Sequence, residues 1–250
     1  MTALSVNLNK IALLRNARGR DYPNVVAMGE QAIEAGASGL TIHPRPDERH
    51  ARYADIGLLK KLCEKHHVEL NVEGYPNDDL LAYCIASQVE QVTLVPDAPN
   101  QITSDHGWSI HSHERMLTEA ITTLKTNGIR VSLFMDADST EIALAKTVGA
   151  DRIELHTESY ARSFERGAHE RQIALFKDAF DRALDAGLSV NAGHDLTVDN
   201  LPYFLQHIPV AEVSIGHALT VEALQLGWQC VIARYVAICQ NPMNYHRDCR

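Results

Sequence analysis

Eight short apolar segments recur along this chain, and several of them end on a polar side chain that can transfer a proton or bind an anion. The segments are rich in Val, Ile and Leu, which is typical of strands buried in a parallel sheet. We expect strands at about residues 4–8, 39–43, 68–73, 91–95, 130–135, 152–156, 188–192 and 212–216. Segments with helical spacing separate these strands, which indicates βαβ units. In a chain of 250 residues this pattern predicts an α/β fold and suits a (β/α)8 TIM barrel, with a doubly wound sheet as the alternative.

The polar residues at the strand ends are far apart in the sequence but close together in such a barrel. Every strand of a parallel barrel has its carboxyl end on the same face, where the fold carries its chemistry. The residues that this rule places around one mouth are Asn7, Asn9, His43, Glu73, Glu154, His156, His194, Gly216 and His217. Glu154 faces either the barrel top or the helix layer, depending on the strand register. For His156 and His217 the alternative is a core histidine bonded to a backbone carbonyl, and we prefer that alternative for His156.

The connections between the strands contain regular turns and a few irregular segments. Glycines expected to end helices precede four of the strands, because only glycine adopts the left-handed conformation at low cost: Gly36, Gly128, Gly149 and Gly187. Residues 10–24 are expected to form an extended loop or a short extra helix. Residues 94–116 begin with a polar loop that is longer than ordinary βα loops, which indicates a functional segment. A long apolar helix is expected over 218–240, where it would cover the barrel and offer a subunit contact.

The composition favours one globular domain, residues 1–250, with a flexible tail at 241–250. Hydrophobic residues make up 45% and charged residues 22% of the chain, which is ordinary for a soluble protein. No apolar run is long enough for a membrane span, and the first residues do not resemble a signal peptide. The formal net charge of -9 argues against a nucleic-acid or anionic-membrane partner. The negative net charge does not exclude small phosphorylated ligands, because backbone N–H groups and a few arginines suffice to bind them.

The five cysteines show no C-x-x-C spacing. Four are expected in helices and the fifth, Cys249, in the tail. This usage indicates reduced thiols in a cytoplasmic protein, and neither a disulfide framework nor a zinc site.

Two basic segments are candidates for binding an anion. The loop HPRPDERH, residues 43–50, follows the second strand and contains His43, Arg45, Arg49 and His50, which together could clamp a phosphate or a polyol. Its alternative is a solvated charged loop, and its place at a strand end favours function. Arg18, beside Gly19, either binds an anion or is a surface cation at a helix end.

Proton transfer is expected mainly from Glu73 and His194. A carboxylate at the end of an apolar strand is partly desolvated, which raises its pKa toward the range of a general acid or base. Glu154 has the weaker claim, because barrel interiors also bury charges that only orient a neighbour. His194 ends the seventh strand, and the loops after strands seven and eight form the common phosphate site of these barrels.

The order and content of the motifs resemble the pyridoxine 5′-phosphate synthase family, the ring-closing enzymes of vitamin B6 synthesis. The motifs are SVNLNKIALLRNARG, TIHPRPDERH, LNVEG, LVPD, VSLFMDAD, IELHTESYA, VNAGHDLT and VSIGH, and they cover nearly the whole chain. The resemblance implies a (β/α)8 barrel with extra helices, no metal or organic cofactor, and a homo-octamer built as a tetramer of dimers. It also implies the condensation of 3-amino-2-oxopropyl phosphate with 1-deoxy-D-xylulose 5-phosphate to pyridoxine 5′-phosphate, phosphate and water.

The resemblance also implies roles for single residues. His43 and Glu73 match general acid/base positions, His194 matches a proton donor, and Glu154 matches a supporting acidic position. The positions that hold the amino-ketone phosphate are matched by Asn7, Arg18, Gly216 and His217. Those for the deoxyxylulose phosphate are matched by Arg45, His50 and Thr103.

The chain departs from the family pattern at three places. Asn9 and Lys10 stand at substrate-binding positions where the family commonly has Asp-His, although members with the motif VNLNK or VNINK occur. Pro44 stands where an apolar residue is common. Asp195 replaces a glycine, which brings a negative charge and a Cβ atom near the expected phosphate.

Two other functions fit the same residues. A metal-dependent barrel hydrolase or isomerase would gather the histidines and glutamates of the mouth as ligands. Against it, the first strand offers N-x-N-K instead of an H-x-H pair, and no tight ligand spacing occurs. A non-catalytic sensor of phosphorylated metabolites would bind the phosphates and form no product.

Overall fold

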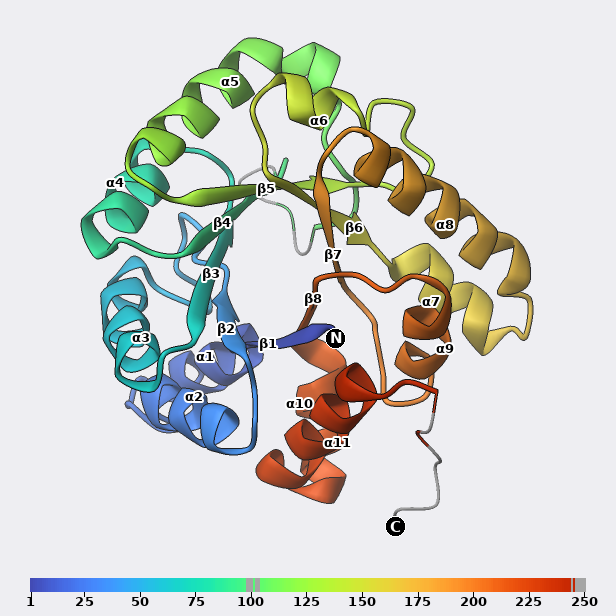
Figure 1. The fold of residues 1–250 in the computed structure, drawn as a ribbon. Coiled ribbons are helices and arrows are strands. Elements are labelled where there is room, and N and C mark those ends of the chain that lie inside the picture. Colours follow the sequence, from blue (N-terminus) through green and yellow to red (C-terminus); the bar gives the residue numbers. More distant parts are fainter. Residues whose placement is uncertain (98–100, 102–103, 244, 246–250) are drawn as a thin grey trace.

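The eight expected strands close into one parallel barrel, which Figure 1 shows as a ring of arrows surrounded by helices. The computed structural model describes residues 1–97, 101, 104–243 and 245. Each strand pairs with the next in sequence, and β8 pairs with β1 to close the ring. The strands are β1 (Ala3–Asn7), β2 (Gly39–Ile42), β3 (Glu69–Gly74), β4 (Gln91–Leu94), β5 (Arg130–Met135), β6 (Arg152–His156), β7 (Ser189–Gly193) and β8 (Glu212–Ile215). The predicted fold is confirmed, and every strand boundary lies within one residue of its predicted position.

The helices form the outer layer and include the expected extra one. They are α1 (Asn9–Asn16), α2 (Val25–Glu34), α3 (Tyr53–His66), α4 (Asp78–Ser87), α5 (Ile110–Thr126), α6 (Leu144–Thr147), α7 (Glu158–Glu165), α8 (Glu170–Asp185), α9 (Leu201–His207), α10 (His217–Leu226) and α11 (Trp228–Gln240). Helix α1 is the short extra helix considered for residues 10–24. The single long helix expected over 218–240 is wrong. Gly227 has φ 85° and ψ 149°, a conformation that is almost confined to glycine, and it separates α10 from α11.

Glycines follow the ends of several helices, and the described cysteines lie within helices. The four glycines expected to end helices all have positive φ, with values of 103° at Gly36, 78° at Gly128, 99° at Gly149 and 76° at Gly187. Of the cysteines, Cys63, Cys84, Cys230 and Cys239 lie in helices as free thiols, and Cys249 lies outside the described residues. Most of the predicted tail lies outside the described residues too. None of the helices in the described ranges has the length and apolarity needed to cross a bilayer.

The inside of the barrel is largely polar, with Phe134 as an apolar exception beside His156 and His194. Strand residues that face the helices are apolar, and the alternate residues are buried polar side chains: Ser5, Thr41, Asn71, Gln91, Thr93, Ser132, Glu154, Asn191, Glu212 and Ser214. Barrels of this type usually fill these positions with Val, Ile and Leu. A polar interior has to be hydrogen-bonded to be stable, because burial of an unpaired polar group costs about 1–3 kcal/mol.

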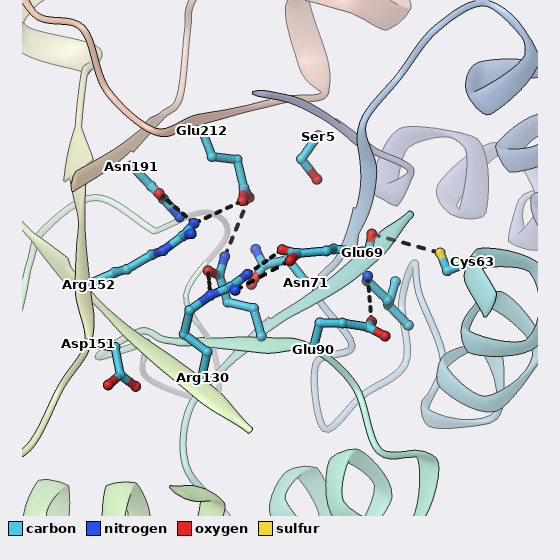
Figure 2. A network of polar contacts seen from close by, with 12 residues as sticks. Ser5, Cys63, Glu69, Asn71, Glu90, Arg130, Asp151, Arg152, Asn191 and Glu212 are labelled. Atoms are coloured by element: carbon cyan, nitrogen blue, oxygen red, sulfur yellow. Dashed lines mark hydrogen bonds and ion pairs between the residues drawn. The ribbon is translucent and has the colours of Figure 1, made fainter. Parts of the chain in front are cut away.

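Ion pairs occupy the end of the barrel where the strands begin, as Figure 2 shows. Arg130 pairs with Glu69, and its Nε donates to Gln91 Oε1 over 2.9 Å. Arg152 donates to Glu212 Oε2 over 3.3 Å and to an amide oxygen of the neighbouring strand β7. These arginines and carboxylates neutralise one another at the amino ends of the strands.

Candidate active site

A cavity of about 400 Å³ opens at the carboxyl ends of the strands. The ends of β1, β3 and β6 and the loops after β2, β7 and β8 supply most of its wall. The sequence-predicted residues that line it are Asn7, Asn9, Lys10, His43, Arg45, His50, Glu73, Glu154, His156, His194, Asp195, Gly216 and His217. The register therefore turns Glu154 into the barrel, which was the open question at this position.

For two residues that the sequence assigned to substrate binding, the role stays a prediction. Arg18 lies on the exposed turn after α1 and is not among the described residues that line the cavity, so its contact with a phosphate stays a prediction. Thr103 lies outside the described residues. His217 is exposed at the first position of α10, so the alternative of a core histidine is wrong for it.

Glu73 lies at the centre of the hydrogen bonds that cross the floor of the cavity. Its Oε2 accepts from Asn7 Nδ2 over 3.4 Å, and its Oε1 accepts from Ser214 Oγ over 3.3 Å. His43 Nδ1 is 3.8 Å from Oε2. Glu73 is thus held from β1 and β8 while facing a histidine from the loop after β2.

Two buried carboxyl groups that line the cavity, Glu73 and Glu154, have raised pKa values. Burial raises the pKa of Glu73 to about 8, and the negative charge of Asp97 adds to this. Burial also raises the pKa of Glu154 well above its usual range, with a further contribution from Glu73. Within the described residues Glu154 accepts one long hydrogen bond, of 3.4 Å from Thr93 Oγ1. A carboxylic acid with a pKa near 8 is a general acid or base suited to neutral pH.

Three histidines of the cavity, His43, His50 and His194, have lowered pKa values and are neutral at pH 7. Desolvation, together with the charge of Arg45, lowers the pKa of His43 well below its ordinary value and that of His50 to about 4. Desolvation and the neighbouring His156 lower the pKa of His194 to about 3. Neutral imidazoles accept a proton on one nitrogen and donate one from the other. The cavity therefore combines carboxyl groups whose pKa values are raised with imidazole groups whose pKa values are lowered.

The loop after β2 is held in place by the two asparagines of the first motif. The backbone N–H of His43 donates to Asn9 Oδ1 over 2.8 Å, and that of Asn9 donates to Asn7 Oδ1 over 3.0 Å. Asn9 thus positions His43, a role that the sequence did not suggest. Arg45 is buried and bonds Asp97 through Nη2, while its Nε has no hydrogen-bond partner in the described part of the chain. A buried guanidinium N–H of this kind is suited to an anion.

The loops after β7 and β8 bring the backbone close to the cavity. A Cβ atom at Gly216 would lie 2.9 Å from Asn7 Cβ, so only glycine fits where α10 begins. His194 and Asp195 have φ values of 79° and 56°, which are unusual for residues other than glycine. Asp195 is exposed, so the charge that replaces the family's glycine is in contact with water.

Two side chains of the site, Asp97 and Asp136, were not assigned by the sequence, and for a third, His156, the sequence favoured a core position. His156 is buried in the cavity wall, and its Nδ1 lies 3.4 Å from Asp136 Oδ1, so the preferred core interpretation is wrong. Asp136 in turn accepts the N–H of Gly107 over 2.8 Å. Asp97 is the last residue of the motif LVPD and contacts His43 and Arg45. Asp97 and Asp136 both follow strand ends, so the rule that found Glu73 would also have found them.

The residues named for a metal-dependent enzyme do line one cavity. Across residues 1–97, 101, 104–243 and 245, however, no three His, Cys, Asp or Glu side chains are grouped so that they could hold a metal ion. No ligand cluster therefore supports that alternative in the described structure.

Solved structures resemble this chain in fold. A mutant tryptophan synthase from M. tuberculosis superposes with a TM-score of 0.64 at 14% identity, covering 94% of this chain and 92% of that one. Thiamine phosphate pyrophosphorylase from Pyrococcus furiosus superposes with a TM-score of 0.63 at 13% identity, covering 96% of both chains. At these identities the likeness supports the barrel fold alone.

Sequence relatives are much closer. Pyridoxine 5′-phosphate synthase from Chelativorans sp. (strain BNC1) is 49% identical over 243 residues, which cover 95% of this chain and 98% of that protein. The protein of the same name from Allorhizobium ampelinum is 49% identical over 244 residues, covering 94% and 97%. A family model described as pyridoxal phosphate biosynthesis protein PdxJ matches residues 4–241. The chain belongs to this PdxJ family.

Proposed function

We propose that this protein is a pyridoxine 5′-phosphate synthase. In this reaction 3-amino-2-oxopropyl phosphate and 1-deoxy-D-xylulose 5-phosphate condense, and the products are pyridoxine 5′-phosphate, phosphate and water. The observation that carries the proposal is the set of proton-transfer groups in one cavity: Glu73 with a pKa of about 8 beside the neutral His43, and His194 in the same wall. The close relatives bear the same name.

The chemistry needs repeated proton transfer rather than a covalent enzyme intermediate. The substrate amine attacks the substrate ketone, so the imine nitrogen comes from the substrate. Loss of phosphate, addition of water, enolisation, ring closure and dehydration follow, and each moves a proton at carbon, nitrogen or oxygen. In our proposal Glu73 and His43 share these transfers by exchanging protonation states, since one begins protonated and the other neutral. Two bound phosphates would hold the reacting carbons in place.

His194 is proposed as a proton donor, and its low pKa in the substrate-free protein bears on this role. With a pKa of about 3 the ring is neutral and cannot release a proton as an imidazolium. A phosphate ester bound beside it would favour the charged form and raise this pKa. We therefore propose that substrate binding raises the pKa of His194, so that the ring takes up a proton and can act as a donor.

The direct test is to incubate the purified protein with both substrates and to follow formation of the pyridine chromophore. We expect product only when both substrates are present. Binding of the phosphates without any product would instead identify a non-catalytic sensor. Metal analysis of the same preparation, and turnover after dialysis against a chelator, would distinguish the metal-dependent alternative.

Arg45→Lys should weaken binding of deoxyxylulose phosphate about tenfold, because lysine cannot reproduce the fork geometry of the guanidinium. Titration calorimetry with this substrate alone measures the dissociation constant. Arg52→Lys is the control at the end of the same loop, since Arg52 is exposed and does not belong to the described cavity wall. An unchanged dissociation constant for Arg45→Lys would refute the contact.

We further propose that the protein assembles as an octamer, a tetramer of dimers, and acts in the cytoplasm. The family resemblance supplies the number of subunits. Exposed leucines support self-association: Leu13 and Leu14 on α1 are 43% and 48% exposed, and Leu224 on the adjoining α10 is 81% exposed. Leu224→Glu should shift light scattering toward smaller species, whereas Leu184→Glu on α8 should not. Identical masses for both variants would contradict this surface as a contact.

A further inference from the structure

Asp97 occupies an unusual position between the loop after β4 and the residues of the cavity. It follows Pro96, three residues beyond the end of β4, and its side chain is only 3% exposed. A single oxygen, Oδ2, accepts from Arg45 Nη2 and from Ser104 Oγ, the latter over 2.8 Å. The same oxygen lies 3.6 Å from His43 Nε2. Asp97 does not itself line the cavity among the described residues, so it acts through its neighbours.

His43 is consequently held between two carboxyl groups. Glu73 Oε2 lies 3.8 Å from Nδ1 on one side of the ring, and Asp97 Oδ2 lies 3.6 Å from Nε2 on the other. Both distances exceed a hydrogen bond, so at rest these are electrostatic contacts. Catalytic hydrogen bonds are often long in a substrate-free site and shorten when the substrate binds.

The two carboxyl groups differ in their partners, and this difference favours one tautomer of the His43 ring. Asp97 is paired with the guanidinium of Arg45, which keeps a negative oxygen beside Nε2. Glu73 has no cationic hydrogen-bond partner in the described structure, and its bonds come from neutral side chains. A negative oxygen favours a hydrogen on the nitrogen that faces it. That arrangement leaves Nδ1 as the acceptor that faces Glu73.

We propose that Asp97 is a positioning residue for the condensation: it fixes His43 as the tautomer with hydrogen on Nε2, so that Nδ1 exchanges protons with Glu73. The same oxygen accepts from Ser104, so the tautomer of His43 also depends on the position of the loop after β4. The inference rests on the proposed function for its kinetic part. Its structural part, the tautomer of His43, does not depend on any substrate.

The other charged and titratable groups that face His43 act on the ring as a whole. They are Arg45, Arg49 and His50 on its own loop and His194 from the loop after β7, and all of them oppose a positive ring. Together with desolvation they keep His43 neutral. The choice between the two neutral tautomers is left to the groups at its two nitrogens, Glu73 and Asp97.

Nitrogen NMR of ¹⁵N-histidine-labelled protein tests the tautomer directly, with the signal of His43 assigned from His43→Gln. In the substrate-free protein we expect Nε2 to carry the hydrogen. Asp97→Asn should shift the population toward hydrogen on Nδ1, because the negative charge beside Nε2 is lost. Asp97→Glu should restore the original tautomer at least in part. An unchanged tautomer in Asp97→Asn would overturn the inference.

Kinetics test whether the tautomer matters to the reaction. Asp97→Asn should lower kcat about tenfold or more and change the pH profile of kcat, with a smaller change in KM, since loss of an oriented acid/base pair lowers the chemical step. Asp138→Asn, an exposed carboxylate at the same end of the barrel, should leave both constants unchanged. A shifted tautomer with unaltered kcat would overturn the positioning role. If the unmodified protein forms no product, the proposed function fails, and the NMR result still decides the tautomer.

Discussion

Glu73→Gln is expected to abolish turnover while leaving substrate binding largely intact. Glutamine has nearly the same shape: its one oxygen can keep the hydrogen bond from Asn7, and its amide nitrogen can donate to the Ser214 hydroxyl in place of the bond that Ser214 gives to the carboxylate. It cannot, however, release or take up a proton. Loss of a general acid/base usually costs about 10²–10⁴-fold in rate. Single-turnover measurements of product formation check this, with calorimetry for the affinity. A wild-type rate would remove Glu73 from the mechanism.

The same substitution should make the folded protein more stable in alkaline solution. The pKa of Glu73 is about 8 in the folded protein against an ordinary value of 4.5. Between these pH values the folded protein keeps a proton that the unfolded chain has lost. The contribution of Glu73 to the free energy of unfolding is therefore fully present below pH 4.5 and is lost as the pH rises toward 8. Glutamine carries no such dependence, so the variant should melt at a higher temperature than the wild type at pH 9 and at a similar one at pH 5.

Glu212→Gln is the matched control for the effect on turnover. Glu212 is also a buried carboxyl group on a barrel strand, but it bonds Arg152 and Gln91 at the opposite end of the barrel. Its substitution should lower stability, because Arg152 loses an ionic partner, and should leave kcat unchanged. Equal losses of kcat in the two variants would indicate that any change in the polar interior disturbs the enzyme.

The sequence was sufficient for the barrel and for the main side chains of its mouth because both follow from local rules. Apolar runs of four to six residues mark the strands, and a parallel barrel gathers the residues that follow them. Glu73, His43 and His194 meet around one cavity for this reason. The break at Gly227 was missed because the apolar pattern of 218–240 continues across it, and only the backbone conformation reveals the interruption.

Pairings between side chains could not be predicted in this way. His156 was placed in the core because nothing adjacent in the sequence shows that Asp136, on the neighbouring strand end, faces its ring. The contact of Asp97 with Arg45 joins residues 52 positions apart and depends on the path of the loop after β4. Such contacts depend on rotamers and loop geometry, which periodicity does not encode. The polar residues of the motifs LVPD and VSLFMDAD were visible, but their partners were not.

Gly107→Ala is expected to destabilise the protein and to impair catalysis, because the loop after β4 is fastened to β5 at this residue. A Cβ atom at Gly107 would lie 2.4 Å from the backbone nitrogen of Asp136 and 2.6 Å from Met135 Cα. Backbone atoms cannot move aside as a side chain can, so the loop has to lift. Overpacking of this kind typically costs about 1–3 kcal/mol. Chemical denaturation measures that loss.

Gly107→Ala should impair catalysis because the hydrogen bonds of Gly107 and Trp108 hold the loop after β4 against the cavity residues. Gly107 N–H donates to Asp136, which faces His156, and the next residue, Trp108, donates from its backbone to Phe134 and from its indole to Leu94. Displacement of the loop at Gly107 should also displace His156 and the rim of the cavity, so kcat/KM should fall more than tenfold. Misplacement of catalytic groups by about 1 Å can lower the rate 10²-fold. Gly57→Ala in helix α3 is the control: its nearest neighbour is 3.7 Å away, and alanine there should raise stability by about 0.5–1 kcal/mol with unchanged kinetics. Wild-type kcat/KM in Gly107→Ala would mean that the loop does not need this attachment to shape the cavity.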